Sequence, residues 1–200
     1  MASDELARAD RRLLAVLDQR LDEGRRRAGP WLACRPGCAE CCHGPFPITR
    51  LDAWRLRRGL AELASREPAR AAALVARAQA QRETLAAGFP GDWERGTVSD
   101  EPPAGDLYFT RHARLPCPVL DPETGTCGLY SHRPLTCRTF GPPIRVDGEL
   151  LPPCHLCFAG VDEGSVAACR VEPDPHGLED RILARLGDDE TLIALVLSQA

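Results

Sequence analysis

Ten cysteines in a chain of 200 residues constrain this protein more than any other feature of its sequence. Nine of them fall into groups, at Cys34, Cys38, Cys41, Cys42, Cys117, Cys127, Cys137, Cys154 and Cys157, and Cys169 stands apart. Ten in 200 is 5%, which is below the roughly 8–10% that marks a small secreted disulfide scaffold.

The expected location of the chain also argues for reduced thiols. Residues Met1 to Glu5 carry no basic region and lead into no apolar core, so no secretory signal peptide is visible. The longest late apolar run, Leu192 to Leu197, falls short of the about 20 residues of a membrane helix. We therefore expect a cytoplasmic protein with no membrane partner, whose thiols stay reduced. Metal binding is the first candidate use for them.

The charge balance narrows the range of partners. The formal net charge is −4 and the sequence pI is about 5.8, whereas a sequence-independent nucleic-acid binder needs a basic surface. All 25 basic residues are arginine, which we interpret as the codon usage of a GC-rich, bacterial genome. We expect no nucleic-acid partner, and the sequence points to no particular protein partner.

Apolar periodicity and capping residues predict a largely helical chain. The expected helices cover residues 3–27, 49–65, 68–88, 177–187 and 189–199. Thr49 predicts an N-cap, with Asp52 three residues later as in a capping box. Pro68 suits the first turn of the helix that it opens.

The segments between these helices predict loops. Residues 88–116 read as an irregular surface excursion, and residues 144–151 as a β-hairpin that turns at Asp147-Gly148. The expected fold class is mainly α and a single domain, with irregular, metal-stapled loops and at most a short β-hairpin. Its expected parts are an N-terminal helix (1–30), a cysteine-cluster domain (31–170) with a helical insertion (49–87), and C-terminal helices packing on the same domain (171–200).

The first cysteine group lies in the segment Cys34-Arg-Pro-Gly-Cys38-Ala-Glu-Cys41-Cys42. The two residues between Cys38 and Cys41 allow both thiolates to turn toward one ion, and Gly37 permits the tight turn that this needs. The Cys41-Cys42 doublet could serve two sites, or one site and its immediate surroundings. Four thiols within nine residues indicate metal binding.

The later cysteines lie in segments rich in proline and glycine, which are typical of ligand loops. Cys154-His155-Leu-Cys157 forms a second C-x-x-C motif. Arg133 and Arg138 bracket Cys137, and we expect them to contact a bound cofactor and offset the negative charge of its thiolates. The isolated Cys169 is expected to be a small buried hydrophobe.

Other chemistries find little support in the sequence. It contains no dinucleotide-binding glycine motif, no phosphate-binding P-loop, no H-E-x-x-H and no G-x-S-x-G. A redox dithiol is less favoured, because neither C-x-x-C follows a strand and opens a helix within a βαβ pattern.

The order of these motifs resembles the YkgJ-type cysteine-cluster proteins, a family described as chelating zinc or iron. The matching residues are Cys34, Cys38, Cys41, Cys42, Cys117, Pro118, Leu120, Asp121, Gly125, Cys127, Tyr130, Arg133, Pro134, Cys137, Arg138 and Phe140. The resemblance spans about residues 34–158, and it implies metal binding more firmly than any reaction. Some longer relatives that share the cluster are flagellin lysine methylases.

We expect the early and late cysteines to converge on one or two thiolate-ligated sites that staple the loops. The strongest expected ligands are Cys38, Cys41, Cys127 and Cys137, followed by Cys117, Cys154 and Cys157. An iron–sulfur cluster is favoured over zinc, because adjacent cysteines and loop-borne ligands are unlike a compact zinc ribbon. The expected function is a structural or sensory metal-binding module. A metal-cluster enzyme of redox or methyl-transfer type is the alternative.

Overall fold

The computed structural model describes residues 3–99, 104–146 and 148–199. Two compact units can be distinguished, and each is described by itself. Unit 1 consists of Met1–Pro36 and Thr136–Leu186, and unit 2 consists of Gly37–Leu135 and Gly187–Ala200.

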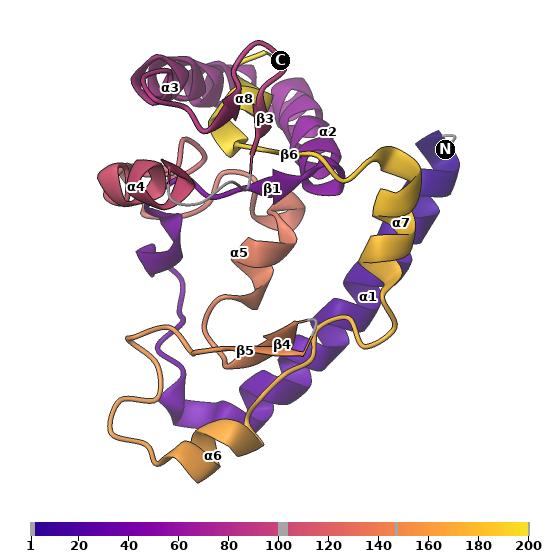
Figure 1. Ribbon diagram of the computed structural model, residues 1–200, viewed down its shortest axis with the longest axis vertical. Coiled ribbons are helices and arrows are strands. Elements are labelled where there is room, and N and C mark those ends of the chain that lie inside the picture. Colours follow the sequence, from indigo (N-terminus) through magenta and orange to yellow (C-terminus); the bar gives the residue numbers. More distant parts are fainter. Residues whose placement is uncertain (1–2, 100–103, 147, 200) are drawn as a thin grey trace. The chain divides into compact units, whose positions relative to one another are not determined.

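Unit 1 is built on the long helix α1 (Ser3–Ala28), against which α7 (Leu178–Leu186) packs (Figure 1). Acidic residues in the first turn of α1 and arginines in its last turn suit the helix dipole. Gly24 lets the chain approach closely, because a Cβ there would lie 2.1 Å from Cγ2 of Val171. The apolar stripe that this helix buries consists of Leu6, Leu13, Leu17 and Leu21.

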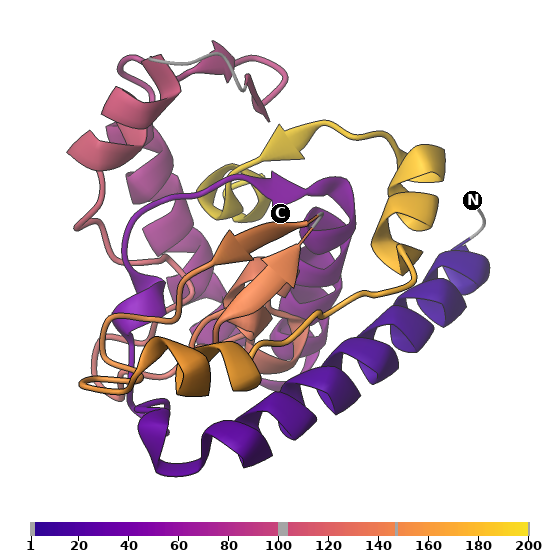
Figure 2. The ribbon, with the colours of Figure 1, turned by 60° about the horizontal axis from the view of Figure 1, so that its bottom comes forward.

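The rest of unit 1 is short elements and loops. The hairpin of β4 (Ile144–Val146) and β5 (Glu149–Leu151) is antiparallel, as its two arrows show in Figure 2. Helix α6 (Glu163–Ala168) is capped by Asp162, whose carboxylate accepts from the amide of Ser165. Helix α5 (Leu135–Thr139) begins at the last residue of the main segment of unit 2 and continues into unit 1.

Unit 2 is a helical group with a small sheet beside it (Figure 1). Its helices are α2 (Arg50–Arg66), α3 (Pro68–Leu85), α4 (Ala104–Arg111) and α8 (Ile193–Leu197). The sheet has the order β1-β6-β3-β2, all antiparallel, from β1 (Ile48–Thr49), β2 (Gly91–Asp92), β3 (Thr97–Val98) and β6 (Glu190–Thr191). Two 3₁₀ turns, η2 (Glu40–Cys42) and η3 (Tyr130–His132), carry residues of the candidate site.

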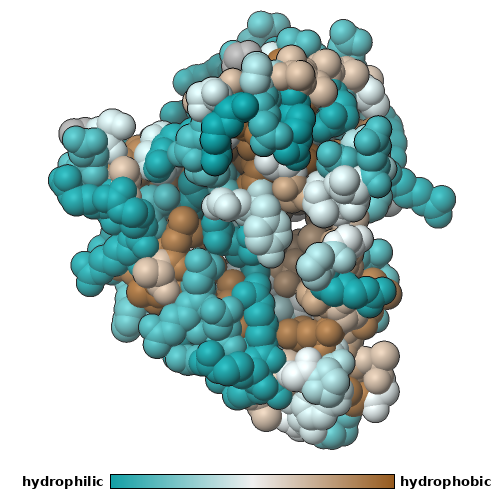
Figure 3. All heavy atoms as spheres, turned by 180° about the vertical axis from the view of Figure 1, so that it is seen from behind, coloured by the Kyte–Doolittle hydropathy of each residue, from teal (hydrophilic) through white to brown (hydrophobic). Residues whose placement is uncertain are grey.

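Apolar burial holds each unit together. In unit 2, side chains of α2, α3 and α8 form most of the main core, to which Val119 and Leu129 also belong, and Cys117 and Cys127 pack against it. A second cluster of unit 2 surrounds Tyr108, whose hydroxyl donates to the carbonyl of Leu85. On the face drawn in Figure 3, hydrophilic side chains in teal predominate and hydrophobic ones form smaller brown areas.

The mainly helical fold class is confirmed by this structure. Thr49 caps α2 as predicted, because its Oγ1 accepts from the amide of Asp52 at 3.2 Å, and Pro68 opens α3. The hairpin over residues 144–151 is also present, although Asp147, half of its predicted turn, lies outside the described residues. The predicted domain boundaries stay a prediction.

The structure differs from the expectations in two places. Residues 88–116 contain β2, β3 and α4, where an irregular excursion was expected. The last predicted helix, 189–199, is instead β6 followed by the five-residue α8. Two-residue strands are too short to show an alternation of apolar and polar residues in the sequence. Their pairing depends on partners that are distant in the chain. Within the described ranges, no helix has the length and apolar character needed to span a membrane.

Candidate metal centre

The ten cysteines divide between the two units. Unit 1 holds Cys34, Cys137, Cys154, Cys157 and Cys169, and unit 2 holds Cys38, Cys41, Cys42, Cys117 and Cys127. In the described part of the chain, no disulfide bond joins any two of them.

Backbone pairing brings the first cysteine segment of unit 2 against the second. The amide of Cys117 donates to the carbonyl oxygen of Cys42 at 2.7 Å, and His43 forms an antiparallel bridge with Pro116. The turn η2 presents Cys41 and Cys42 beside this junction. The chain then turns back on itself, because Leu120 forms an antiparallel bridge with Cys127. We call Cys41, Cys42, Cys117 and Cys127 the unit 2 thiol group.

Cys38 lies on a neighbouring loop. The residue before it, Gly37, has φ +86°, and Gly125, close before Cys127, has φ +66°. A Cβ on Gly125 would lie 3.4 Å from the carbonyl oxygen of Gly37. Both turns therefore favour glycine, and their contact holds the Cys38 loop beside the Cys127 loop.

The thiols of this group interact electrostatically. The hydrogen bond with Cys42, followed by burial, raises the pKa of Cys41 above its ordinary value. Burial raises the pKa of Cys117 to about 11 and also raises that of Cys127. The charge of Cys41 further raises the pKa of both. Forming each thiolate is therefore unfavourable here without a nearby cation. A bound metal ion supplies that positive charge and favours the deprotonated thiols.

Two of these sulfurs already receive backbone hydrogen bonds. The amides of Val119 and Leu120 donate to the sulfur of Cys117, and the amide of Leu129 donates to that of Cys127. In both cases a donor lies two residues after the cysteine. These donors favour the anionic form that ligates metals, so the loops suit thiolate ligands.

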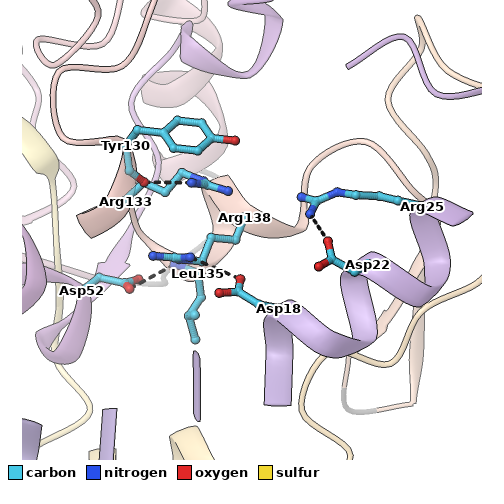
Figure 4. A network of polar contacts seen from close by, with 8 residues as sticks. All are labelled: Asp18, Asp22, Arg25, Asp52, Tyr130, Arg133, Leu135 and Arg138. Carbon is cyan, nitrogen blue, oxygen red and sulfur yellow. Dashed lines mark hydrogen bonds and ion pairs between the residues drawn. The ribbon is translucent and has the colours of Figure 1, made fainter. Parts of the chain in front are cut away.

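The charge of one guanidinium group, that of Arg133, acts on two of these thiols. Arg133 lies over the ring of Tyr130, with its Cζ 3.7 Å from the ring centroid, and its Nη1 donates to the Tyr130 carbonyl at 2.8 Å (Figure 4). Its charge lowers the pKa of Cys41 and of Cys127, against the larger opposing effects. The predicted role of Arg133 beside a cofactor stays a prediction, and its effect on these two thiols is consistent with it.

The second predicted arginine lies in unit 1. Arg138 is 6% exposed, and its Nη1 lies 3.3 Å from Oδ1 of Asp18 on α1 (Figure 4). It follows Cys137, which is half-buried on α5. Arg138 therefore contacts a carboxylate of α1, and its predicted contact with a cofactor stays a prediction.

The other cysteines of unit 1 lie around Gly141. A Cβ on this glycine, which has φ +114°, would lie 2.8 Å from the sulfur of Cys34. The carbonyl of Gly141 accepts from the amide of Cys154 at 3.1 Å. Cys157 is buried, and its sulfur accepts from the amide of Ala33 at 3.4 Å. The structure therefore brings the predicted ligands Cys34, Cys154 and Cys157 into one neighbourhood of unit 1.

Cys169 is 2% exposed and packs in an apolar cluster with Ala28, Cys157 and Phe158. This burial agrees with its expected role as a small hydrophobe.

Among the residues that the structure describes, no three His, Cys, Asp or Glu side chains already form an arrangement that could hold a metal ion. The donor set of unit 2 nevertheless fits a thiophilic metal in its chemistry, because it offers thiols, amide donors to sulfur and a compensating cation. Binding would draw the thiols together from their present positions.

Sequence reasoning did not identify the role of Asp52 beyond the capping box. Its Oδ1 accepts from the amide of Leu135 at 3.0 Å and from Nη1 of Arg55 at 2.6 Å. The only available signal was an acid and a base three residues apart on the apolar face of a helix. Burial raises the pKa of Asp52, although Arg55 opposes the shift.

Comparison with known proteins supports the same chemistry. The CxxCxxCC family, described as "Putative zinc- or iron-chelating domain", matches residues 33–157. Searches of curated proteins and of solved structures found no match. The family match covers more than half of the 200 residues and includes every cysteine group described above. The chain therefore belongs to the CxxCxxCC family of zinc- or iron-chelating domains.

Proposed function

We propose that the unit 2 thiol group is a metal site and that the bound metal has a structural or sensory role. The observation that carries this proposal is the junction between Cys42 and Cys117, which gathers thiols from two segments on either side of α2 and α3. The amide donors to Cys117 and Cys127 and the charge of Arg133 support it, because each favours thiolates.

The residues proposed to hold the metal in unit 2 are Cys41, Cys42, Cys117 and Cys127, with Cys38 on the adjoining loop. Cys34, Cys137, Cys154 and Cys157 stay predicted ligands in unit 1. The metal content per chain distinguishes one site from two.

We favour an iron–sulfur cluster over zinc. The neighbouring thiols come from three loops, and two of them accept hydrogen bonds from backbone amides. Hydrogen bonds of this kind to the ligand sulfurs tune the reduction potential of iron–sulfur clusters. A bound cluster would supply electron exchange, and a bound zinc ion would supply only cross-linking at a closed shell.

The position of the proposed ligands supports a structural role. The loops that carry them contribute Val119 and Leu129 to the main buried core, most of which comes from α2, α3 and α8. Structural zinc in small domains contributes on the order of 10–16 kcal/mol, which is comparable with the roughly 5–15 kcal/mol stability of a whole domain. One metal would therefore be enough to order these loops.

A cavity beside Cys117 bears on the enzyme alternative. It is lined by Phe46, Gln81, Leu85 and neighbouring residues, and its volume is about 20 Å³. Such a volume accommodates about one water molecule. We therefore prefer the structural or sensory role to a redox or methyl-transfer enzyme that binds its substrate at this site.

The test compares two cysteine-to-serine variants purified without oxygen. Cys127→Ser removes a proposed ligand and should lower the metal content and the unfolding temperature together. Cys169→Ser is the matched control, because Cys169 lies in an apolar cluster, and it should keep the wild-type metal content. If Cys127→Ser does not fold, the wild-type protein is titrated with a chelator instead. The number of free thiols is then counted as the metal is removed. Equal metal loss in both variants would contradict the proposal.

A further inference from the structure

The loop that joins β5 to α6 in unit 1 carries the second C-x-x-C motif, Cys154-His155-Leu156-Cys157 (Figure 1). Cys154 is partly exposed, and His155 and Leu156 are exposed. Cys157 is buried, with 5% of its surface exposed. The motif therefore places one accessible thiol and one buried thiol in a single short segment.

A hydrogen-bonded turn brings these two cysteines together. The amide of Cys157 donates to the carbonyl oxygen of Cys154 at 2.7 Å. A four-residue turn keeps its first and last Cα atoms within about 7 Å, and disulfides usually join Cα atoms that are about 4.4–6.8 Å apart. The turn therefore brings the pair into the range of a disulfide bond, although no helix begins at the motif.

Contacts on both sides hold this turn in place. The amide of Cys154 donates to the carbonyl of Gly141 at 3.1 Å, and the amide of Phe158 donates to the carbonyl of Trp31 at 2.8 Å. Phe158 has φ +56°, a left-handed conformation that a residue with a Cβ seldom adopts. Such a conformation persists only where the surrounding structure imposes it, so the chain next to Cys157 follows a fixed path.

The surroundings of the two sulfurs suit both a thiolate and a disulfide. The sulfur of Cys157 accepts a hydrogen bond from the amide of Ala33 at 3.4 Å, and a hydrogen bond of this kind favours the thiolate. Cys157 belongs to an apolar cluster that includes Phe158 and Cys169, and Cys154 packs against the same cluster. Because a disulfide carries no charge, the cluster can accommodate it without burying an ion.

We propose that Cys154 and Cys157 form a thiol–disulfide exchange site, whose substrates are disulfides such as that of oxidised glutathione. Cys154 is the attacking thiol because it is the accessible one, and Cys157 is the resolving thiol. This inference goes beyond the proposed function and does not depend on the metal site of unit 2. It gives the two residues a role other than the metal ligation predicted from the sequence.

The exchange takes place in two steps. The thiolate of Cys154 attacks one sulfur of oxidised glutathione, which forms a mixed disulfide and releases one glutathione thiolate. The thiolate of Cys157 then attacks the sulfur of Cys154, forms the Cys154–Cys157 bond and releases the second glutathione. The two protons of the cysteine pair end on the two released glutathione molecules, and two electrons pass from the pair to the substrate.

The test treats the full chain, purified without oxygen, with oxidised glutathione. Acid then stops the exchange, and N-ethylmaleimide blocks the remaining thiols. Peptide mass mapping of the wild-type protein should find Cys154–Cys157 as the first internal disulfide to form. Cys157→Ala should instead accumulate the mixed disulfide at Cys154, because the resolving thiol is missing. Cys154→Ala should form neither product in this segment.

A matched control and a metal measurement make the test specific. Cys169→Ala removes a thiol from the same apolar cluster and should form the Cys154–Cys157 disulfide at the wild-type rate. Formation of this disulfide should leave the metal content of the wild-type protein unchanged. If Cys157→Ala does not fold, the wild-type map and Cys154→Ala still test the proposal.

A first disulfide that joins Cys154 to Cys34 or Cys169, or the absence of any disulfide at Cys154, would overturn the inference. Loss of metal as the Cys154–Cys157 disulfide forms would also overturn it, because the pair would then be metal ligands. The proposed function fails on a different result, an unchanged metal content in Cys127→Ser, so the two failures are distinguishable.

Discussion

The amide of Cys117 donates a 2.7 Å hydrogen bond to the carbonyl oxygen of Cys42, which joins two cysteine segments separated in the chain by α2 and α3. The folded backbone therefore brings these thiols together through ordinary hydrogen bonds and core packing. A metal would strengthen a junction that the chain already makes.

Metal removal should loosen the loops and spare the helices. Hydrogen exchange on metal-loaded and chelator-treated protein should show lost protection across residues 38–42 and 117–127. Protection should persist in α2 and α3, because their core of leucines and alanines involves the thiols only at its edge. Unchanged protection in 117–127 after complete metal removal would defeat the structural role and favour the enzyme alternative.

Arg138 should contribute to stability through its buried guanidinium. Arg138→Gln should lower the free energy of unfolding by about 1–3 kcal/mol, since buried hydrogen bonds to a charged group are lost. Asp18→Asn is the comparison, and should cost less than about 1 kcal/mol because Asp18 is half exposed. Denaturant unfolding measures both, and an equal cost in the two variants would contradict this assignment.

Asp162 should titrate below the ordinary aspartate value. Hydrogen bonds from the side chain and amide of Ser165, at 2.7 and 2.9 Å, lower its pKa. A lowered folded pKa means that this cap stabilises α6 fully above the ordinary pKa of about 3.9. The stabilisation is lost as pH falls through the lowered value. Carboxyl NMR should find the Asp162 midpoint below 3.9 and should find it raised in Ser165→Ala. A wild-type midpoint at or above 3.9 would refute the cap.

The sequence was sufficient for features that depend on local chemistry. Thr49 and Pro68 begin their helices as predicted, because a cap or a fixed φ acts within one turn. The cysteine groups pointed to the family for a similar reason, since ligand spacing is local.

Long-range relationships were out of reach of the sequence. Cys34 and Cys38 are neighbours in the chain, yet they belong to different units. The contact of Asp52 with the Leu135 amide joins residues 83 apart, and nothing in the local pattern of either residue indicates it. The two-residue strands and α4 likewise depend on tertiary partners rather than on periodicity.

The central claim is that this chain uses its thiols to hold a metal, and the most direct measurement is the composition of the anaerobically purified protein. Metal, inorganic sulfide, free thiols and the visible spectrum are measured on one preparation whose folding is verified by circular dichroism. We predict stoichiometric iron with sulfide and a visible absorption band, or stoichiometric zinc, with correspondingly fewer titratable thiols. A fully folded, metal-free protein with ten free thiols would contradict the account.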